Sequence, residues 1–176
     1  MRVLVVRHGC AGHKRDWDGE DAERPLDASG EHQAVALTDL LVEADLGIRR
    51  LRTSPARRCR DTLVPLGRRL GLPVVDDPAL AVHGVDDALW QVLAAPSSVS
   101  AALCTHGELM QPLLTHLRAG GVAITAERDD DEWLLAKGTA WLLDRTDDGR
   151  VTALRHLTPD PALGCDAHLP AGDANT

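Results

Sequence analysis

The sequence predicts an α/β fold, a three-layer α/β/α sandwich around a mostly parallel central sheet. Residues 2–6 are a continuous run rich in the β-branched residue valine, which is typical of a strand buried on both faces of a parallel sheet. Further strand-like runs alternate with amphipathic helical stretches, the order expected of such a layered domain. A chain of 176 residues, 44% of them hydrophobic, is long enough to bury one core. We therefore expect a single folded domain.

The first quarter of the chain contains a strand, a loop and a helix. Residues 2–6 form the expected strand. The polar stretch 10–25 that follows is too long for a simple turn and is therefore expected to be a functional loop. A helix should begin near Asp27 or Ser29, with Gly47 just beyond its end as a left-handed cap.

The next segment repeats the strand-then-helix order. Residues 48–53 are expected to be the second strand. Ser54 and Pro55 form a helix-start signature, since serine caps free backbone amides and proline at the first helical position loses no hydrogen bond. Pro65 should end or kink this helix, and residues 71–75 should form a short strand.

The second half continues the alternation. Residues 86–94 are expected to be helical, 99–104 a strand of small apolar residues, and 108–117 a helix with a leucine stripe. Two further segments, 132–135 and 139–144, are expected to be extended.

The end of the chain is predicted to consist of a hairpin and a tail. Residues 147–149 carry a hairpin-turn signature and 150–157 should be the last strand. The remainder is rich in Pro, Ala, Gly and Asp without an apolar period. We therefore expect a folded domain over residues 1–158 and a C-terminal tail over 159–176.

Composition excludes several functions. A formal charge of −8 argues against nucleic acid or a membrane surface as partner, because both are polyanions. No apolar run approaches a membrane span or a signal-peptide core, which favours a cytoplasmic location. The cysteines are scattered without a C-x-x-C pair, so reduced, structural thiols are expected. They are Cys10, Cys59, Cys104 and Cys165.

Four basic side chains are placed where strands end or helices begin. Arg7 and His8 end the first strand, Arg58 lies in the first turn of the helix after the second strand, and His106 ends a later strand. Such positions converge at the carboxyl edge of a doubly wound sheet. Two arginines and a histidine can clamp the oxygens of a phosphoryl group, because guanidinium binds phosphate in a bidentate way. The remaining histidine, His8, is then the nucleophile, held as a neutral imidazole.

Three motifs resemble the histidine phosphatase, or phosphoglycerate-mutase-like, superfamily. Arg7-His8-Gly9 resembles its signature, and the stretch from Ser54 to Thr62 resembles its S-P-x-x-R-x-x-x-T segment. Cys104-Thr-His106-Gly107 resembles its second histidine motif. The resemblance implies a metal-independent hydrolase that needs no cofactor and works through a phosphohistidine intermediate on His8.

The short chain resembles the small phosphohistidine-phosphatase branch of that superfamily. Residues 19–26, 103–107 and 137–142 are similar to the histidine-phosphatase half of mycobacterial proteins that carry a fused Nudix domain. Two partner classes remain open, a phosphorylated protein and a small phosphorylated metabolite such as a nucleotide. Phosphohistidine is the first choice. A third reading is a catalytically weak phosphate-binding module.

The proton donor of the resembled family has no obvious counterpart. Residues 80–87, where that family usually carries a glutamate, contain none. An imidazole leaving group needs less acid assistance than an alkoxide, so the absence favours phosphohistidine. Asp86 is the first candidate for a donor, with His83 and Asp87 as alternatives.

Three more residues are expected to contact the substrate, and no residue is expected to bind a metal. Gly9 and Gly107 each follow a histidine of the site. Lys14 lies in the loop beside the nucleophile, where a cation could reach the phosphate.

Overall fold

The computed structural model describes residues 1–82, 88–159 and Cys165, and in this part of the chain the strands form one seven-stranded sheet. The sheet order is β3-β2-β4-β1-β6-β7-β5. The strands are β1 (Arg2–Arg7), β2 (Arg50–Thr53), β3 (Val74–Asp76), β4 (Ala101–Thr105), β5 (Ala123–Thr125), β6 (Ala140–Arg145) and β7 (Val151–Leu157). Strands β3, β2, β4 and β1 are parallel, whereas β6 is antiparallel to both β1 and β7. The sheet is therefore mostly parallel, as expected.

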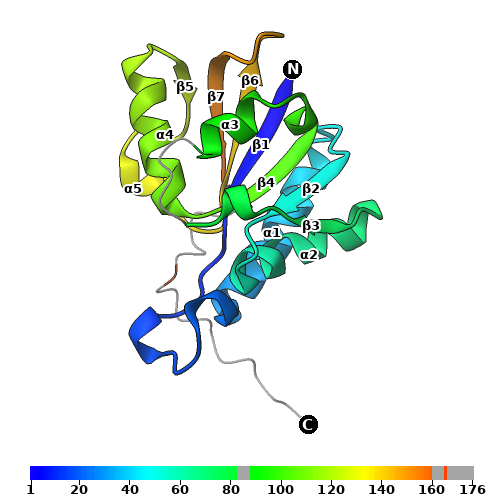
Figure 1. The fold of residues 1–176 in the computed structure, drawn as a ribbon, viewed down its shortest axis with the longest axis vertical. Coiled ribbons are helices and arrows are strands. Elements are labelled where there is room, and N and C mark those ends of the chain that lie inside the picture. Colours follow the sequence, from blue (N-terminus) through cyan, green and yellow to red (C-terminus); the bar gives the residue numbers. More distant parts are fainter. Residues whose placement is uncertain (83–87, 160–164, 166–176) are drawn as a thin grey trace.

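Helices cover both faces of the sheet (Figure 1). They are α1 (Ala28–Glu43), α2 (Arg57–Leu70), α3 (Ala88–Ala94), α4 (Gly107–Ala119) and α5 (Asp131–Leu134). Helices α1 and α2 pack on one apolar cluster, whereas α3, α4 and α5 pack on another. Strand β1 contributes Val3 and Val5 to the second cluster and Leu4 and Val6 to the first. The predicted three-layer α/β/α architecture is confirmed, and β1 is buried on both faces.

Four short 3-10 turns complete the described elements. They are η1 (Lys14–Asp16), η2 (Asp21–Glu23), η3 (Pro78–Leu80) and η4 (Pro96–Ser98). The first two lie in the loop predicted over residues 10–25. Among the helices of the described residues, none combines the length and apolar character that a membrane crossing requires.

One local prediction is wrong, and one strand was not predicted. The segment expected to be extended at 132–135 is mostly the helical turn α5, which the Asp130 side chain caps by accepting from the Trp133 amide at 2.9 Å. Strand β5 was not predicted, because its three residues pair only with β7 and show no alternating pattern over so short a length.

The boundaries of α1 and α2 also differ from expectation. Helix α2 begins after Pro55 and runs through Pro65 to Leu70, where Gly71 adopts a left-handed φ of 66°. The buried apolar face of α2 outweighs the backbone hydrogen bond that Pro65 cannot make. Helix α1 ends four residues before Gly47, which takes its positive φ in the loop beyond.

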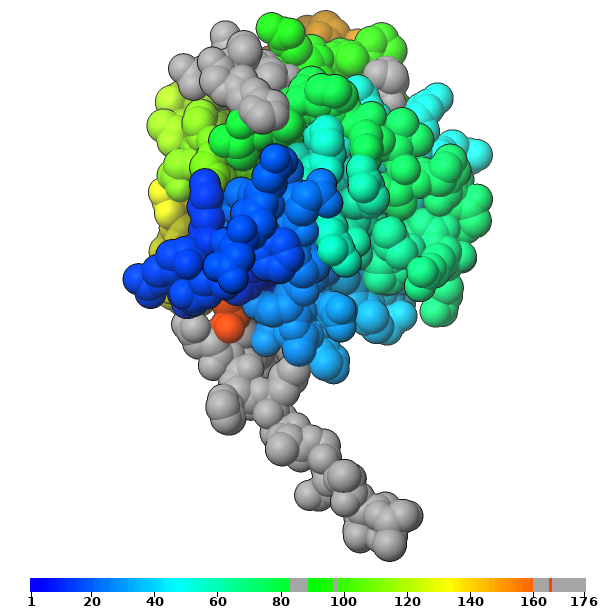
Figure 2. All heavy atoms as spheres, turned by 60° about the horizontal axis from the view of Figure 1, so that its bottom comes forward, coloured from blue at the N-terminus to red at the C-terminus, as the bar shows by residue number. Residues whose placement is uncertain are grey.

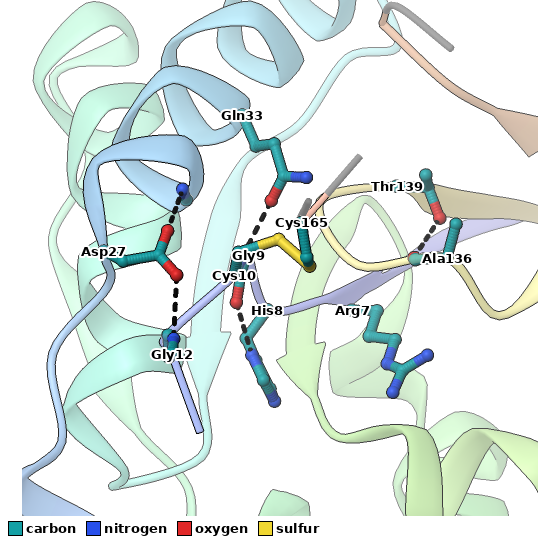
Figure 3. Close-up of a disulfide and its surroundings, with 12 residues drawn as sticks. Arg7, His8, Gly9, Cys10, Gly12, Asp27, Gln33, Ala136, Thr139 and Cys165 are labelled. Carbon is teal, nitrogen blue, oxygen red and sulfur yellow. Dashed lines mark hydrogen bonds between the residues drawn. A yellow bond between two sulfur atoms is a disulfide. The ribbon is translucent and has the colours of Figure 1, made fainter. Parts of the chain in front are cut away.

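A disulfide joins Cys10 to Cys165, with a Cα separation of 5.5 Å (Figure 3). The expectation of reduced thiols is therefore wrong for this pair. The other two cysteines, Cys59 and Cys104, are free and buried as expected. A sequence separation of 155 residues hides the pair from any local pattern. The boundary at residue 158 stays a prediction, since most of the segment after it lies outside the described residues.

Candidate active site

The parallel pairing of β1 and β4 brings the two histidine motifs together. Arg7 is the register partner of Thr105, and the His8 amide donates to the Thr105 carbonyl at 3.2 Å. His8 and His106 therefore leave the sheet side by side, with ring centroids 5.2 Å apart in an edge-to-face arrangement. Figure 2 looks toward this end of the molecule, where the blue N-terminal loop lies across the surface.

His8 is held as a neutral imidazole. Its side chain is 7% exposed, and Nδ1 lies 2.7 Å from the Gly9 carbonyl oxygen, which can only accept. Nδ1 is therefore the protonated nitrogen and Nε2 keeps its lone pair. Burial holds the pKa of His8 well below its usual range, and the positive charges of Arg58 and Arg7 act in the same direction, against the Gly9 hydrogen bond. No described group bonds to Nε2.

His106 has three polar neighbours, namely Ser54, Arg58 and the Cys59 thiol, whose Sγ lies 3.5 Å from Nε2. Nε2 lies 2.8 Å from the Ser54 hydroxyl, and Nδ1 lies 3.4 Å from Nη2 of Arg58. Because a guanidinium can only donate, Nδ1 is the accepting nitrogen, so Nε2 carries the proton and donates to Ser54. The ring is 2% exposed and directly precedes α4. Ser54 thus links the second motif to the third.

Arg7 is held by a backbone carbonyl and by close packing. Its Nη1 donates to the Leu135 carbonyl in the turn after α5. A Cβ built on Gly107 would lie 2.8 Å from the Arg7 Cζ, so any side chain there would require the guanidinium to shift from its position. Burial lowers the pKa of Arg7 from its usual value, against the opposing charge of Glu108. Gly107, expected to bind substrate, therefore contacts Arg7 directly.

Arg58 is held by an acidic residue that sequence reasoning missed. Nη1 donates to the Asp21 carbonyl at 2.7 Å, and Nη2 donates to Asp21 Oδ2 at 3.1 Å. Arg58 is 7% exposed, and its buried Nε has no acceptor among the described residues. Nothing in the local sequence distinguishes Asp21 from the other acidic residues of the loop.

Gly9 packs against the start of α1. Its amide donates to the Thr62 hydroxyl at 3.0 Å, and Thr62 in turn donates to the Arg58 carbonyl at 2.7 Å. A Cβ at Gly9 would lie 2.9 Å from the Gly30 carbonyl oxygen. The structure therefore gives Gly9 a packing role, and its substrate contact stays a prediction.

The remaining predicted site residues are Lys14 and the three candidate proton donors. Lys14 lies exposed in η1, at the surface of the loop beside the nucleophile. His83, Asp86 and Asp87 lie outside the described residues, so the proton donor stays a prediction. Among the residues that the structure does describe, no three His, Cys, Asp or Glu side chains gather in a metal-binding arrangement.

A second missed residue is Lys137. The following amide, of Gly138, lies 3.2 Å from the carbonyl oxygens of both Arg7 and His8, which places Lys137 beside the nucleophile segment. Burial lowers the pKa of Lys137, and the nearby charges of Arg7 and Arg24 add to this effect. The site therefore gathers more positive charge than the three motifs alone predict.

Comparisons with known proteins agree with this geometry. Residues 3–81 match the model of the histidine phosphatase superfamily (branch 1). An 8-oxo-(d)GTP phosphatase of Mycolicibacterium smegmatis is 29% identical over 164 residues, which cover 89% of this chain and 48% of that protein. This chain thus spans about half the length of that relative.

Solved structures show the same fold. The protein histidine phosphatase SixA in complex with tungstate has a TM-score of 0.66 at 24% identity, over 90% of this chain and 97% of that one. A SixA structure from Agrobacterium tumefaciens has a TM-score of 0.65 at 22% identity, over 87% of this chain and 96% of that one. The match over residues 3–81 and the three converging motifs make this chain similar to the histidine phosphatase superfamily (branch 1).

Proposed function

We propose that the chain is a phosphatase that transfers a phosphoryl group to Nε2 of His8. The observation that carries the proposal is the state of His8 itself. Its Nδ1 proton is committed to the Gly9 carbonyl, and the unprotonated Nε2 belongs to a ring flanked by His106 and two guanidinium groups. A neutral imidazole beside a cationic clamp is the arrangement that nucleophilic attack on phosphorus needs.

The proposed reaction has two steps. In the first, the His8 Nε2 lone pair forms a bond to phosphorus while the bond from phosphorus to the leaving group breaks. Arg7 and Arg58 stabilise the charge on the transferred group, and His106 can share in this only by turning an N–H away from Ser54. In the second step, water attacks phosphorus, and the bond to Nε2 breaks to return neutral His8 and release phosphate.

Phosphohistidine is the first substrate that we propose. A departing imidazole needs little protonation, and residues 80–87 contain no glutamate to protonate an alkoxide. If a donor acts on other substrates, Asp86 is our first candidate.

We also propose that the protein is located in the cytoplasm, which a fractionation experiment would test.

A nucleotide or another small phosphorylated molecule is the second candidate substrate. It is favoured by the relative that is named an 8-oxo-(d)GTP phosphatase and matches most of this chain. A panel of phosphohistidine proteins, nucleotides and sugar phosphates, compared by kcat/KM, separates the candidates. No release of phosphate from any of them or from an aryl phosphate would leave only a phosphate-binding module.

The proposal is tested by trapping the intermediate. Wild-type enzyme quenched by denaturation in alkali should carry a phosphate that is stable in alkali and is lost in acid, and His8→Ala should carry none. His32→Ala is the matched control, because His32 is an exposed histidine of α1. Equal labelling of wild type and His8→Ala would refute the nucleophile assignment.

The proposal also predicts that no metal ion is needed. The amount of phosphate bound to the enzyme should be unchanged after exhaustive chelation, because arginine and histidine side chains hold the phosphoryl group.

A further inference from the structure

The clamp arginine Arg58 has a defined partner at its outer edge. Asp21 accepts from Nη1 through its carbonyl and from Nη2 through its carboxylate, at 2.7 and 3.1 Å. The Arg58 side chain is 8% exposed and the Asp21 side chain is 31% exposed. A bidentate contact of this kind restricts the rotation of a guanidinium more strongly than a single bond does. Asp21 therefore determines which N–H groups of Arg58 remain available.

Asp21 is also tied to the loop that follows the nucleophile. Arg24 Nε donates to Asp21 Oδ1 at 3.0 Å, while Arg24 Nη1 donates to the carbonyls of Ala11 and Gly12 at 2.7 and 3.0 Å. The contacts run from Arg58 on α2, through Asp21 and Arg24, to the chain three residues after His8. These contacts thus join Arg58 to the loop that follows His8.

The carboxylate of Asp21 is ionised at neutral pH. Burial opposes its ionisation, but the Arg24 hydrogen bond and the charge of Arg58 outweigh burial and lower the pKa of Asp21. A bare carboxylate would repel the phosphoryl group of a substrate. Here the negative charge of Asp21 is balanced by Arg24 and Arg58. Asp21 can therefore orient Arg58 while it repels the phosphoryl group only weakly.

We infer that Asp21 is a positioning residue for the reaction, which orients Arg58 toward the phosphoryl group and, through Arg24, couples Arg58 to the nucleophile loop. The inference rests on the proposed phosphatase function, in which Arg58 binds the transferred group. Asp21 acts through Arg58 and does not itself touch the reacting atoms.

The test compares two acidic residues of the same loop. Asp18 is exposed and no described group bonds it, so Asp18→Ala removes the same charge without removing a contact. In Asp21→Ala we expect the dissociation constant of orthovanadate to rise about tenfold and kcat/KM for an aryl phosphate to fall by about the same factor. Asp18→Ala should change both by less than about twofold. Melting temperatures of both variants should match wild type.

Two further variants distinguish positioning from a structural or charge effect. Asp21→Asn keeps an oxygen that can accept from Arg58, so it should recover part of the lost vanadate affinity. Arg24→Gln should weaken vanadate binding, and combining it with Asp21→Ala should add little, because both break one chain of contacts.

Distinct results overturn the inference. If Asp21→Ala behaves as Asp18→Ala does, Asp21 has no positioning role. If Asp21→Ala binds vanadate more tightly than wild type, Asp21 competes with the anion. Both results presuppose a wild type that binds vanadate and turns over the aryl phosphate, whereas a wild type that does neither refutes the proposed function itself.

Discussion

The two clamp arginines are held by different chemistry. Arg58 donates to a carboxylate and a carbonyl of one residue, Asp21, so its position depends on an ion pair. Arg7 donates to the neutral carbonyl of Leu135 and fits against the bare backbone of Gly107. Arg58 is therefore held mainly by electrostatic attraction, whereas Arg7 is held mainly by close packing.

The difference determines how each region can be perturbed. An ion pair contributes through charge, which salt and neighbouring carboxylates modify. A close-packed contact is insensitive to salt but intolerant of an added methyl group. One arginine should therefore respond to changes of charge in the loop, and the other to changes of volume in α4.

The largest effect should come from Gly107→Ala. The added Cβ would overlap the Arg7 guanidinium, which is held in place by Leu135, so Arg7 must leave its position. We expect kcat/KM for an aryl phosphate to fall about 100-fold, the cost of losing one transition-state donor. Gly120→Ala is the control at the other end of α4, since its Cβ would come no closer than 3.4 Å to a neighbour. Equal activities would show that packing does not hold Arg7.

An intermediate effect should appear in the pH profile. In the proposed mechanism neutral His8 is the reactive form, and its pKa is lowered in the folded protein, mainly by burial. The kcat/KM should therefore persist as pH falls through about 6.5 and decline only below it. An acid limb at or above 6.5, after correction for ionisation of the substrate, would contradict a protected neutral imidazole.

The same shift has a consequence for stability. Below about pH 6.5 the unfolded chain binds a proton on His8 that the folded chain does not bind, so the free energy of unfolding falls as pH falls.

The acid limb of the pH profile of kcat/KM also tests the comparison of the two arginines. In Asp21→Asn the charge of Arg58 is less balanced, so the limb should move to lower pH, whereas Gly120→Ala should leave it in place.

The smallest effect on activity should come from Cys165→Ser. The Cys10 amide also donates to Gln33 Oε1 at 2.8 Å (Figure 3). The Cys10 carbonyl in turn accepts from the Asp27 amide at 3.0 Å. These bonds hold the nucleophile loop without the disulfide, so kcat/KM should change by less than about twofold while thermal stability decreases. A large loss of activity would mean that the disulfide itself positions His8.

Much of the site could be predicted from sequence because side-chain type carries its chemistry. Three of these residues were found at strand ends and one at the start of a helix, and the structure brings them together; they are Arg7, His8, His106 and Arg58. The partners that hold them could not be found in the same way. The Leu135 carbonyl is present in every residue, so no residue type identifies it as the acceptor of Arg7.

The sequence by itself determined the α/β layering, the order of most strands and helices, and the four basic residues that meet at the candidate site, because apolar periodicity and the motifs at element ends are local properties. Only the tertiary structure decided that Asp21 binds Arg58, that Gly107 makes room for Arg7 and that Cys10 pairs with Cys165. Each of these contacts joins segments far apart in the chain. Their distances depend on how the layers pack, and a linear pattern does not encode packing.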